Sequence, residues 1–427
     1  MKITVIGQNL EGITSAACYA EIGNHVLLCS LKEHHVKRDI STHPCMQDAG
    51  LNGVVNKQIE DRRLSIHPEL DVEKFPADLY VISSMQNSNE ALQSLMDEIA
   101  KDKTCHGVIF TCSIPVGGLD LAVKSGHSPV AYIPEFMREG SALQDFRNPN
   151  SLIIGCENDI LLLLIQELYK PFMKSHTRVQ IMSVKEAEFA RFAVSAMLAT
   201  RVSFMNELAN ISELLNIDID VIQKAVGADP RIGDQYLKPG IGFGGRQLAE
   251  DLLHITDLEN AKPDNAGLLK SVMQINERQK ESLFRKVWRY FNGDLHGKTL
   301  AIWGGAFKPN SSRIDNAPII KLIEAFCYQG VILNIYDPGC EKTLKKYIVE
   351  NGHEANIGTC ENPYQALDGA EALLLVTEWR EFWIPDYDEI KLRLNQPLIF
   401  DGRNIYEPNR MKQRGFQYYG IGRGERV

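Results

Sequence analysis

The sequence predicts an α/β protein in which two Rossmann-like, doubly wound domains are joined by a long central helix and a helical dimerisation domain. Three observations carry this prediction. Strand-like apolar runs alternate with helical patterns in the first and the last third of the chain, which is typical of a mainly parallel sheet. Between them, residues 185–226 contain neither glycine nor proline. The length of 427 residues suits two or three domains of roughly 150 residues each.

The first thirty residues have the pattern of a strand, a tight turn and a helix. Residues 3–6 are β-rich, Gly7 supplies the turn, residues 13–21 are helix-like, and residues 25–29 form a second apolar run. This order predicts a βαβ opening. Further short apolar runs predict more strands of the first sheet at residues 79–82, 107–110, 130–132 and 152–154.

The middle of the chain is predicted to be one long helix. Ser183 precedes Glu186 by three residues, the spacing of a capping box that satisfies the first free N–H groups of a helix. A helix of ~30 residues would be ~45 Å long, so we expect it to bridge two domains and to offer a face for pairing subunits. Apolar residues at steps of three and four mark one face: Phe189, Phe192, Ala193, Ala196, Ala199, Val202, Leu208 and Ile211.

A second α/β unit follows the helical region. Its aromatic tail at residues 416–419 is predicted to be a buried final strand. The earlier strands are predicted at residues 298–304, 331–337, 372–376 and 398–401. We therefore expect three domains, at residues 1–182, 183–294 and 295–427.

Composition and charge argue against several classes of protein. The net charge is 46 − 55 = −9 and the pI is near 5.7, so no basic surface for nucleic acid or anionic lipid is expected. No apolar run approaches the ~18 residues that cross a bilayer. Nine cysteines without paired spacing fit a reducing cytoplasm. His34, His35, His43 and Cys45 lack regular ligand spacing, so we expect no metal site.

Six motifs, in their order and spacing, resemble the UDP-glucose/GDP-mannose dehydrogenase family over nearly the whole chain. Each motif alone is weak, but the set is specific. The motifs are PEFMREG at residues 134–140, RIG at 231–233, PGIGFGG at 239–245, AFKPN at 306–310, FDGRN at 400–404 and GIGRG at 420–424. The resemblance implies an N-terminal domain of the NAD type, a central domain that dimerises, and a C-terminal domain that binds a UDP-sugar.

The catalytic positions depart from the family. The family oxidises the C6 alcohol of the sugar to a carboxylate with two NAD⁺, and a cysteine traps the intermediate aldehyde. Gln247 takes the place of that cysteine, and an amide cannot act as the nucleophile. The family's lysine aligns with Arg191 and its asparagine with Ser195, whereas its aspartate is retained as Asp251. The resemblance therefore implies a family member that has lost the four-electron oxidation.

At three further positions of the predicted site, the residue type is the same as in the family or similar to it. Ser113 occupies the place of a threonine, a milder change in the cofactor half of the site. Glu135 and Glu139, which organise water in the family, are intact. These two carboxylates are either an acid–base remnant or groups that stabilise the fold or contact substrate.

The dinucleotide site has changed independently. In the pattern G-x-G-x-x-G, Gly7 and Gly12 supply the turn and packing glycines, but Asn9 adds a side chain where the pyrophosphate would approach. Ser30 stands where an acidic residue would hold the ribose. NAD is implied by the resemblance, yet its binding is doubtful here, and NADP, held by Ser30 and Lys32, is a weaker alternative. Gly7 and Gly12 could also serve only the packing of strand against helix.

The half of the site that would bind the nucleotide sugar is better preserved. The loop that contains Gly242, Phe243 and Gly244 could cradle phosphate through backbone N–H groups. Lys308 and Arg403 supply cations for a diphosphate or a sugar. The alternative is a structural turn beside two ordinary surface cations.

The resemblance implies three more substrate contacts. Phe136 and Met137 lie in the motif that follows the strand predicted at residues 130–132. Arg231 belongs to the Arg-Ile-Gly motif, which the family places across the dimer interface, so this arginine would reach the partner's site.

Three functions remain open at this point. The first is a nucleotide-sugar dehydrogenase homologue that binds a UDP-sugar without oxidising it, or that regulates or assembles with an active relative in polysaccharide-precursor metabolism. The second is an NAD(P)-dependent UDP-sugar dehydrogenase with altered chemistry, such as a two-electron step that needs no thiol. The third is a purely structural partner of an active relative. In each case we expect a homodimer or a higher homo-oligomer.

Overall fold

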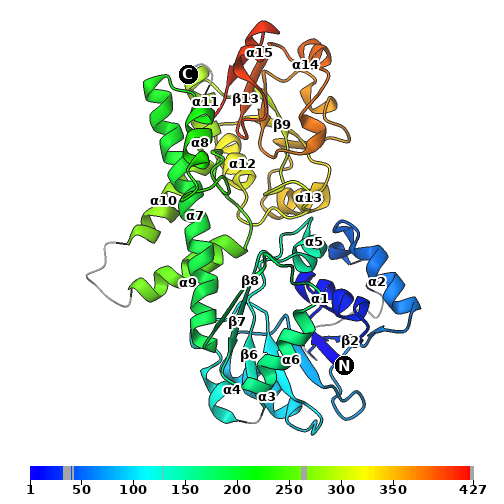
Figure 1. The fold of residues 1–427 in the computed structure, drawn as a ribbon. Helices are drawn as coiled ribbons and strands as arrows, with labels where there is room; N and C mark the ends of the chain where they lie inside the picture. The colour runs from blue at the N-terminus through cyan, green and yellow to red at the C-terminus, as the bar shows by residue number, and fades with distance from the viewer. Residues whose placement is uncertain (32–39, 41–42, 127, 261–266, 424–427) are drawn as a thin grey trace. The chain divides into compact units, whose positions relative to one another are not determined.

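The structure, a computed structural model, describes residues 1–31, 40, 43–126, 128–260 and 267–423. Lys32, His34 and His35 lie outside the described residues. The chain forms two compact units, Met1–Arg191 and Phe192–Val427 (Figure 1). Among the described residues, no helix is long and apolar enough to cross a membrane.

The first unit is built on an eight-stranded sheet in the order β3-β2-β1-β4-β5-β6-β7-β8. Neighbouring strands are parallel except for β6 and β7, which are antiparallel. Because β1 lies between β2 and β4, the strand order reverses there, and α/β sheets bind ligands at such a point. The strands are β1 Lys2–Ile6, β2 His25–Cys29, β3 Leu64–Ile66, β4 Leu79–Ile82, β5 Gly107–Phe110, β6 Val130–Tyr132, β7 Ser151–Cys156 and β8 Arg178–Met182.

Three helices of the first unit begin at side chains that accept backbone N–H groups. Asn9 caps α1, Ser88 caps α3 and Asn158 caps α6. Buried apolar residues of these helices and of the strands form the core of the unit. The helices are α1 Leu10–Glu21, α2 Leu51–Glu60, α3 Asn89–Ile99, α4 Asp120–Ser125, α5 Ala142–Arg147 and α6 Asp159–Tyr169, with a short 3₁₀ turn, η1, at Pro44–Gln47.

The second unit is built on a six-stranded, all-parallel sheet in the order β11-β10-β9-β12-β13-β14. Its last strand carries the aromatic tail, and Phe416 and Tyr418 are buried as predicted. The strands are β9 Thr299–Trp303, β10 Ile332–Tyr336, β11 Ile357–Thr359, β12 Ala372–Leu375, β13 Leu398–Asp401 and β14 Gln417–Tyr419. The α/β class with two mainly parallel sheets and a long central helix is thus confirmed.

The long helix α7 (Val184–Leu215) has 32 residues and begins at the predicted capping box. Ser183 Oγ accepts from the Glu186 N–H at 3.3 Å, and Glu186 Oε2 accepts from the Ser183 N–H at 2.8 Å. The glycine-free stretch is nevertheless two helices, because Asn216 adopts φ +53° and α8 (Ile219–Ala228) starts afresh. The remaining helices are α9 Gln247–Asn260, α10 Leu268–Lys280, α11 Ser282–Tyr290, α12 Pro318–Tyr328, α13 Glu341–Glu350, α14 Tyr387–Arg393 and α15 Pro408–Gln413, with 3₁₀ turns η2 Gln365–Leu367 and η3 Arg380–Phe382.

The predicted apolar face of α7 is only partly buried. Phe192, Ala196 and Ala199 are buried, whereas Phe189 is 49% and Ile211 is 46% exposed. A helix this long meets different neighbours along its length, so one stripe does not stay covered throughout.

Candidate functional site

The turn between β1 and α1 depends on two glycines. Gly7 has φ +127°, and a Cβ atom there would lie 2.4 Å from Ser83 Oγ at the end of β4. A Cβ atom at Gly12 would lie 2.1 Å from the Gly7 carbonyl oxygen. Both glycines are therefore required by the packing of β1, β4 and α1, whatever else the turn binds.

The side chain of Asn9 lies over the first turn of α1. Its Oδ1 accepts a hydrogen bond from the Gly12 N–H at 3.0 Å, and its Nδ2 donates to the Ser83 carbonyl oxygen at 2.9 Å. In a dinucleotide-binding turn, the free N–H groups of this helix end are the donors that hold the pyrophosphate. Here Asn9 takes one of these donors and joins the turn to β4.

The other two cofactor positions are also placed in the first unit. Ser30 follows β2 and is 4% exposed, so a buried serine stands where the dinucleotide pattern has an acidic residue. Ser113 lies in the loop after β5, which α7 holds through Glu188. The fully buried Glu188 carboxylate accepts from the N–H groups of Gly117 at 2.6 Å and Leu119 at 3.0 Å. We did not predict this role, because an acidic residue on a long helix usually faces solvent.

A buried cluster surrounds Glu135 after β6. Burial, reinforced by the charge of Glu11, raises the pKa of Glu135 to about 8, against the opposing effects of Tyr169 and Arg191. The Tyr169 hydroxyl donates to Glu135 Oε1 at 3.5 Å, and the hydroxyls of Tyr169 and Tyr19 are 2.8 Å apart. Arg191 Nη1 donates to the Glu135 carbonyl oxygen at 3.4 Å. Glu135 therefore sits where it can hold a proton near neutral pH.

The residues next to Glu135 serve mainly the fold of the first unit. Met137 is 7% exposed and belongs to the hydrophobic core, and Phe136 is half-buried against a second apolar cluster. Asp48 Oδ2 accepts from the Gly140 N–H, which anchors the end of the segment that contains Glu139. Contacts of Phe136, Met137 and Glu139 with a substrate stay predictions.

In the second unit, two predicted catalytic positions, Ser195 and Asp251, face each other. The Ser195 hydroxyl donates to Asp251 Oδ2 at 2.6 Å, and the two residues are 3% and 1% exposed. Gln247 is the first residue of α9, one helical turn before Asp251, so both lie on the same side of that helix. The hydrogen bond between Ser195 and Asp251 therefore lies one helical turn from the amide side chain of Gln247.

The glycine loop at residues 239–245 is fixed by asparagine side chains. Asn276 Oδ1 accepts from the Phe243 N–H at 2.8 Å, and Asn276 Nδ2 donates to the Phe243 carbonyl oxygen at 3.1 Å. Gly242 has φ +84°, and a Cβ atom there would lie 2.9 Å from Asn276 Oδ1. Asn206 on α7 accepts from the Gly240 N–H at 2.8 Å. Two asparagine side chains therefore fix the backbone of this loop.

This loop adjoins the segments that carry both predicted cations. A Cβ atom at Gly244 would lie 3.0 Å from Phe307 Cβ, and the Lys308 ammonium group is 5.4 Å from the centre of the Phe307 ring. A Cβ atom at Gly240 would lie 3.6 Å from Arg403 Nη1. The Arg403 guanidinium donates from Nε to the carbonyl oxygen of Val376 at 2.7 Å. The second unit therefore gathers the predicted loop, the Lys308 segment and Arg403.

A buried aspartate that the sequence analysis missed supports the Lys308 segment. Asp337 follows β10, the place where a dinucleotide fold carries its ribose-binding acid, but it is 5% exposed and its two oxygens accept five hydrogen bonds. The signal in the sequence that could have identified Asp337 is its position at the end of a predicted strand. The donors are the N–H groups of Gly305, Ala306, Gly339 and Cys340, at 2.7 to 2.9 Å, and Trp379 Nε1 at 2.9 Å.

Arg231 stands apart from these groups. Its side chain is 86% exposed and pairs with Asp229 at 2.7 Å. Arg201 holds the same turn by donating to the carbonyl oxygens of Ile232 and Gly233. Within the described residues, no group of three His, Cys, Asp or Glu side chains is arranged to hold a metal ion.

Comparison with known proteins covers all three regions. The NAD binding domain of the UDP-glucose/GDP-mannose dehydrogenase family matches residues 1–173. The central domain of the same family matches residues 185–278, and its UDP binding domain matches residues 301–408.

Individual relatives match over the full length. A UDP-glucose 6-dehydrogenase of Pseudomonas aeruginosa is 34% identical over 99% of this chain and 98% of its own length. The UDP-glucose 6-dehydrogenase TuaD of Bacillus subtilis is 31% identical over 99% and 93%. A solved UDP-glucose dehydrogenase of Pyrobaculum islandicum superposes with a TM-score of 0.83 at 23% identity, covering 99% of this chain and 98% of that one, which supports the fold.

Proposed function

Because the chain belongs to the UDP-glucose/GDP-mannose dehydrogenase family, we propose that it binds a nucleotide sugar but does not carry out the family's four-electron oxidation. The observation that carries the first half is the meeting of the 239–245 loop with Arg403. A Cβ atom at Gly240 would lie 3.1 Å from the Gly402 carbonyl oxygen, so backbone and cation are already close together. A guanidinium beside a glycine loop suits a diphosphate, because its N–H groups can fork hydrogen bonds to phosphate oxygens.

The second half of the proposal rests on the missing thiol. Gln247 offers an amide, which forms no thiohemiacetal with an aldehyde. In the first unit, the charge of Arg191 acts on the Cys112 thiol, but burial outweighs it and raises the pKa of Cys112 to about 12. A thiol that stays protonated at neutral pH is a weak nucleophile, so Cys112 is a poor substitute.

The turn after β1 does not suit a dinucleotide either. The Asn9 side chain already accepts from the Gly12 N–H, and a pyrophosphate would have to displace it. Ser30 offers the ribose hydroxyls no charged acceptor. We infer that NAD⁺ binds weakly and that no hydride step depends on it in this chain.

Isothermal titration calorimetry on the full chain tests the proposal. UDP-glucose, other UDP-sugars and GDP-mannose are titrated in turn, followed by NAD⁺ and NADP⁺. We expect binding of at least one nucleotide sugar and weak or undetectable binding of NAD⁺. Production of two NADH for each sugar acid formed would contradict the proposal. If no nucleotide sugar binds, only a role as a structural partner of an active relative remains.

Glu135 favours one second candidate, an NAD(P)-dependent enzyme with altered chemistry. A carboxyl group with a pKa of about 8 is suited to proton transfer near neutral pH. A two-electron alcohol oxidation needs a base of this kind and no thiol. Micromolar binding of NADP⁺ together with formation of one NADPH per sugar would promote this candidate over the first.

We further propose that two copies of the chain pair through α7. Met197, Phe204 and Ile211 are spaced by seven residues and are 60%, 52% and 46% exposed, so they form a solvent-facing apolar stripe. A seven-residue repeat is typical of a helix that packs against another helix. Sedimentation equilibrium of the full chain tests this pairing, and a monomer at micromolar concentration would refute it.

A further inference from the structure

The loop that carries Arg403 is anchored by a buried aspartate at its start. Asp401 ends β13 and is fully buried, and its Oδ1 accepts from the Arg403 N–H at 2.9 Å. Its Oδ2 accepts from the Tyr406 N–H and from the Tyr418 hydroxyl, both at 3.0 Å. These bonds fix the backbone of the loop at Arg403, just after β13, and at Tyr406, just before α15.

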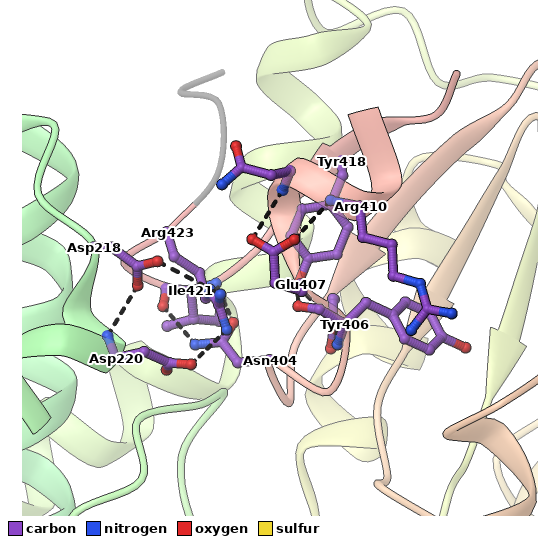
Figure 2. Close-up of polar contacts among 11 residues, drawn as sticks. Asp218, Asp220, Asn404, Tyr406, Glu407, Arg410, Tyr418, Ile421 and Arg423 are labelled. Atoms are coloured by element: carbon purple, nitrogen blue, oxygen red, sulfur yellow. Dashed lines mark hydrogen bonds and ion pairs between the residues drawn. The ribbon is translucent and has the colours of Figure 1, made fainter. Parts of the chain in front are cut away.

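The middle of the loop is held by the last described residues of the chain. Asn404 has φ +54°, and its side chain pairs with the backbone of Ile421 in both directions (Figure 2). Asn404 Nδ2 donates to the Ile421 carbonyl oxygen, and the Ile421 N–H donates to Asn404 Oδ1, each at 2.8 Å. The residue next to Arg403 is thus paired with residues 420–423, a motif that the proposed function does not explain.

The same segment also lies against α7 and α8. The Ile219 N–H, at the start of α8, donates to the Gly422 carbonyl oxygen at 2.9 Å, and the Gly422 N–H donates to Glu213 Oε1 at 2.8 Å. A Cβ atom at Gly422 would lie 2.7 Å from Ala209 Cβ on α7. Only glycine allows the backbone to approach the two helices this closely.

Arg423 adds charge to this attachment. Its side chain is 7% exposed, and its guanidinium pairs with Asp220 at 2.5 Å and with Asp218 at 3.4 Å (Figure 2). Asp218 is the N-cap of α8, where the partial positive charge of the helix end disfavours a cation. The two carboxylates therefore determine where the arginine can sit.

We propose that residues 420–423 form a clasp that positions Arg403, through Asn404, and couples the Arg403 loop to the first turn of α8. This inference rests on the proposed function in one respect, that Arg403 contacts the nucleotide sugar. Coupling is reciprocal, so a ligand that fixes the Arg403 loop also stabilises the start of α8.

The test compares Asn404→Asp with the wild-type full chain. Aspartate tolerates the positive φ and keeps the acceptor for the Ile421 N–H, but it places a carboxylate oxygen against the Ile421 carbonyl oxygen. Asn292→Asp is the matched control, because Asn292 also has positive φ, at +50°, and takes no part in the clasp. The first measurement is the affinity for UDP, which we expect to fall at least tenfold in Asn404→Asp and to stay within twofold in Asn292→Asp.

Two further measurements distinguish positioning from a general loss of stability. Without ligand, the ¹⁵N–¹H signal of Arg403 Nε, assigned with Arg403→Lys, should shift in Asn404→Asp and not in the control. With UDP, hydrogen exchange at residues 217–222 should slow in the wild type and not in Asn404→Asp. Arg423→Lys, which removes the forked pairing with two aspartates, should give the same results and replaces Asn404→Asp if that variant does not fold.

Failure of the clasp and failure of the proposed function look different. If the wild type does not bind UDP or any UDP-sugar, the proposed function fails, and the clasp is then judged on the ligand-free Arg403 signal alone. An Arg403 signal at its wild-type position in Asn404→Asp would overturn the clasp, and so would a slowing of exchange at residues 217–222 by UDP in that variant equal to the slowing in the wild type. Wild-type affinity for UDP in Asn404→Asp would overturn it as well.

Discussion

The Ser195 hydroxyl lies 2.6 Å from Asp251 Oδ2, and this pair is almost completely shielded from solvent. A carboxylate buried to this extent needs a donor, because the cost of removing its water shell must be offset by hydrogen bonds. Ser195 supplies one such donor, and its hydrogen bond to Asp251 joins α7 to α9.

Ser195→Ala should destabilise the protein by about 1.5–3 kcal/mol, because it removes a hydrogen bond to a buried charged group. Ser203→Ala, on the same helix, is the matched control. Ser203 is fully buried and donates to the neutral Val272 carbonyl oxygen at 3.1 Å, so its loss should cost only about 0.5–1.5 kcal/mol. Urea denaturation of the two variants measures the difference, and equal costs would show that the hydrogen bond to the Asp251 carboxylate is no stronger than the one to the Val272 carbonyl oxygen.

Gln247→Cys alone should not restore oxidation of UDP-glucose. The thiol would return, but the resemblance implies a lysine and an asparagine where Arg191 and Ser195 stand, and the Asn9 side chain still lies over the cofactor turn. Losing part of a catalytic set can cost on the order of 10⁴ to 10⁶ in rate, since its members act together. NADH fluorescence with UDP-glucose and NAD⁺ measures this, and turnover at the rate of an active relative would show the other substitutions to be harmless.

Asn9→Gly should raise the affinity for NAD⁺, because it frees the Gly12 N–H for a pyrophosphate oxygen. Glycine at an N-cap costs only a few tenths of a kcal/mol, so the variant should remain folded. Asn9→Ala is the control, since it also frees the donor but keeps a Cβ atom and loses about 0.5–2 kcal/mol of stability. Calorimetric titration measures whether Asn9→Gly binds NAD⁺ more tightly than the wild type. Equal dissociation constants for NAD⁺ would mean that the Asn9 side chain does not hinder its binding.

The free energy of unfolding should fall less steeply with pH in Glu135→Gln than in the wild type, between about pH 4.5 and about pH 8. Burial raises the pKa of Glu135 from its ordinary 4.5 to about 8, so across this range the folded protein holds a proton that the unfolded chain releases. Stability from this group is complete below pH 4.5 and is lost as pH rises through 8, with a slope of up to about 1.4 kcal/mol per pH unit. Glutamine cannot titrate. Urea denaturation of both proteins between pH 5 and pH 8.5 checks the slopes, and parallel curves would rule out a protonated Glu135.

Arg403→Ala and Lys308→Ala should each remove most of the thermal stabilisation by a UDP-sugar. A ligand at 100 times its dissociation constant adds ~2.7 kcal/mol of stability to the wild type, which is visible as a rise in Tm. Lys298→Ala is a suitable control, because this lysine lies over the Phe291 ring and outside the glycine loop. A variant Tm shift equal to that of the wild type would exclude the substituted cation from the binding site.

The sheet strands could be predicted closely because each is a short apolar run bounded by turn residues, as in residues 79–82 and 107–110. The strands β3, β8 and β11 escaped notice, since β8 is exposed at the edge of its sheet and β3 and β11 have only three residues each. The division of the long helical stretch was also missed, because an asparagine with positive φ ends α7 without any glycine or proline.

The site residues that sequence reasoning could propose are those whose residue type indicates a chemistry. A glycine loop, a lysine and an arginine are visible in the sequence, and the second unit brings their segments together. The supporting carboxylate Glu188 was not foreseen, because it accepts the backbone N–H groups of Gly117 and Leu119, which are 71 and 69 residues away in sequence. Such pairings depend on the tertiary fold, and no local pattern encodes them.

Asp337 bears on any attempt to engineer the second sheet into a nucleotide cofactor site. A carboxylate has about four lone-pair positions, and five donors already converge on this one, so a ribose hydroxyl would find no vacancy there. Freeing the carboxylate would release the turn at Gly305 and Ala306 that leads to Lys308. A cofactor site introduced at that edge of the sheet would therefore disorder the segment that carries Lys308. A redesigned cofactor site belongs on the first sheet instead.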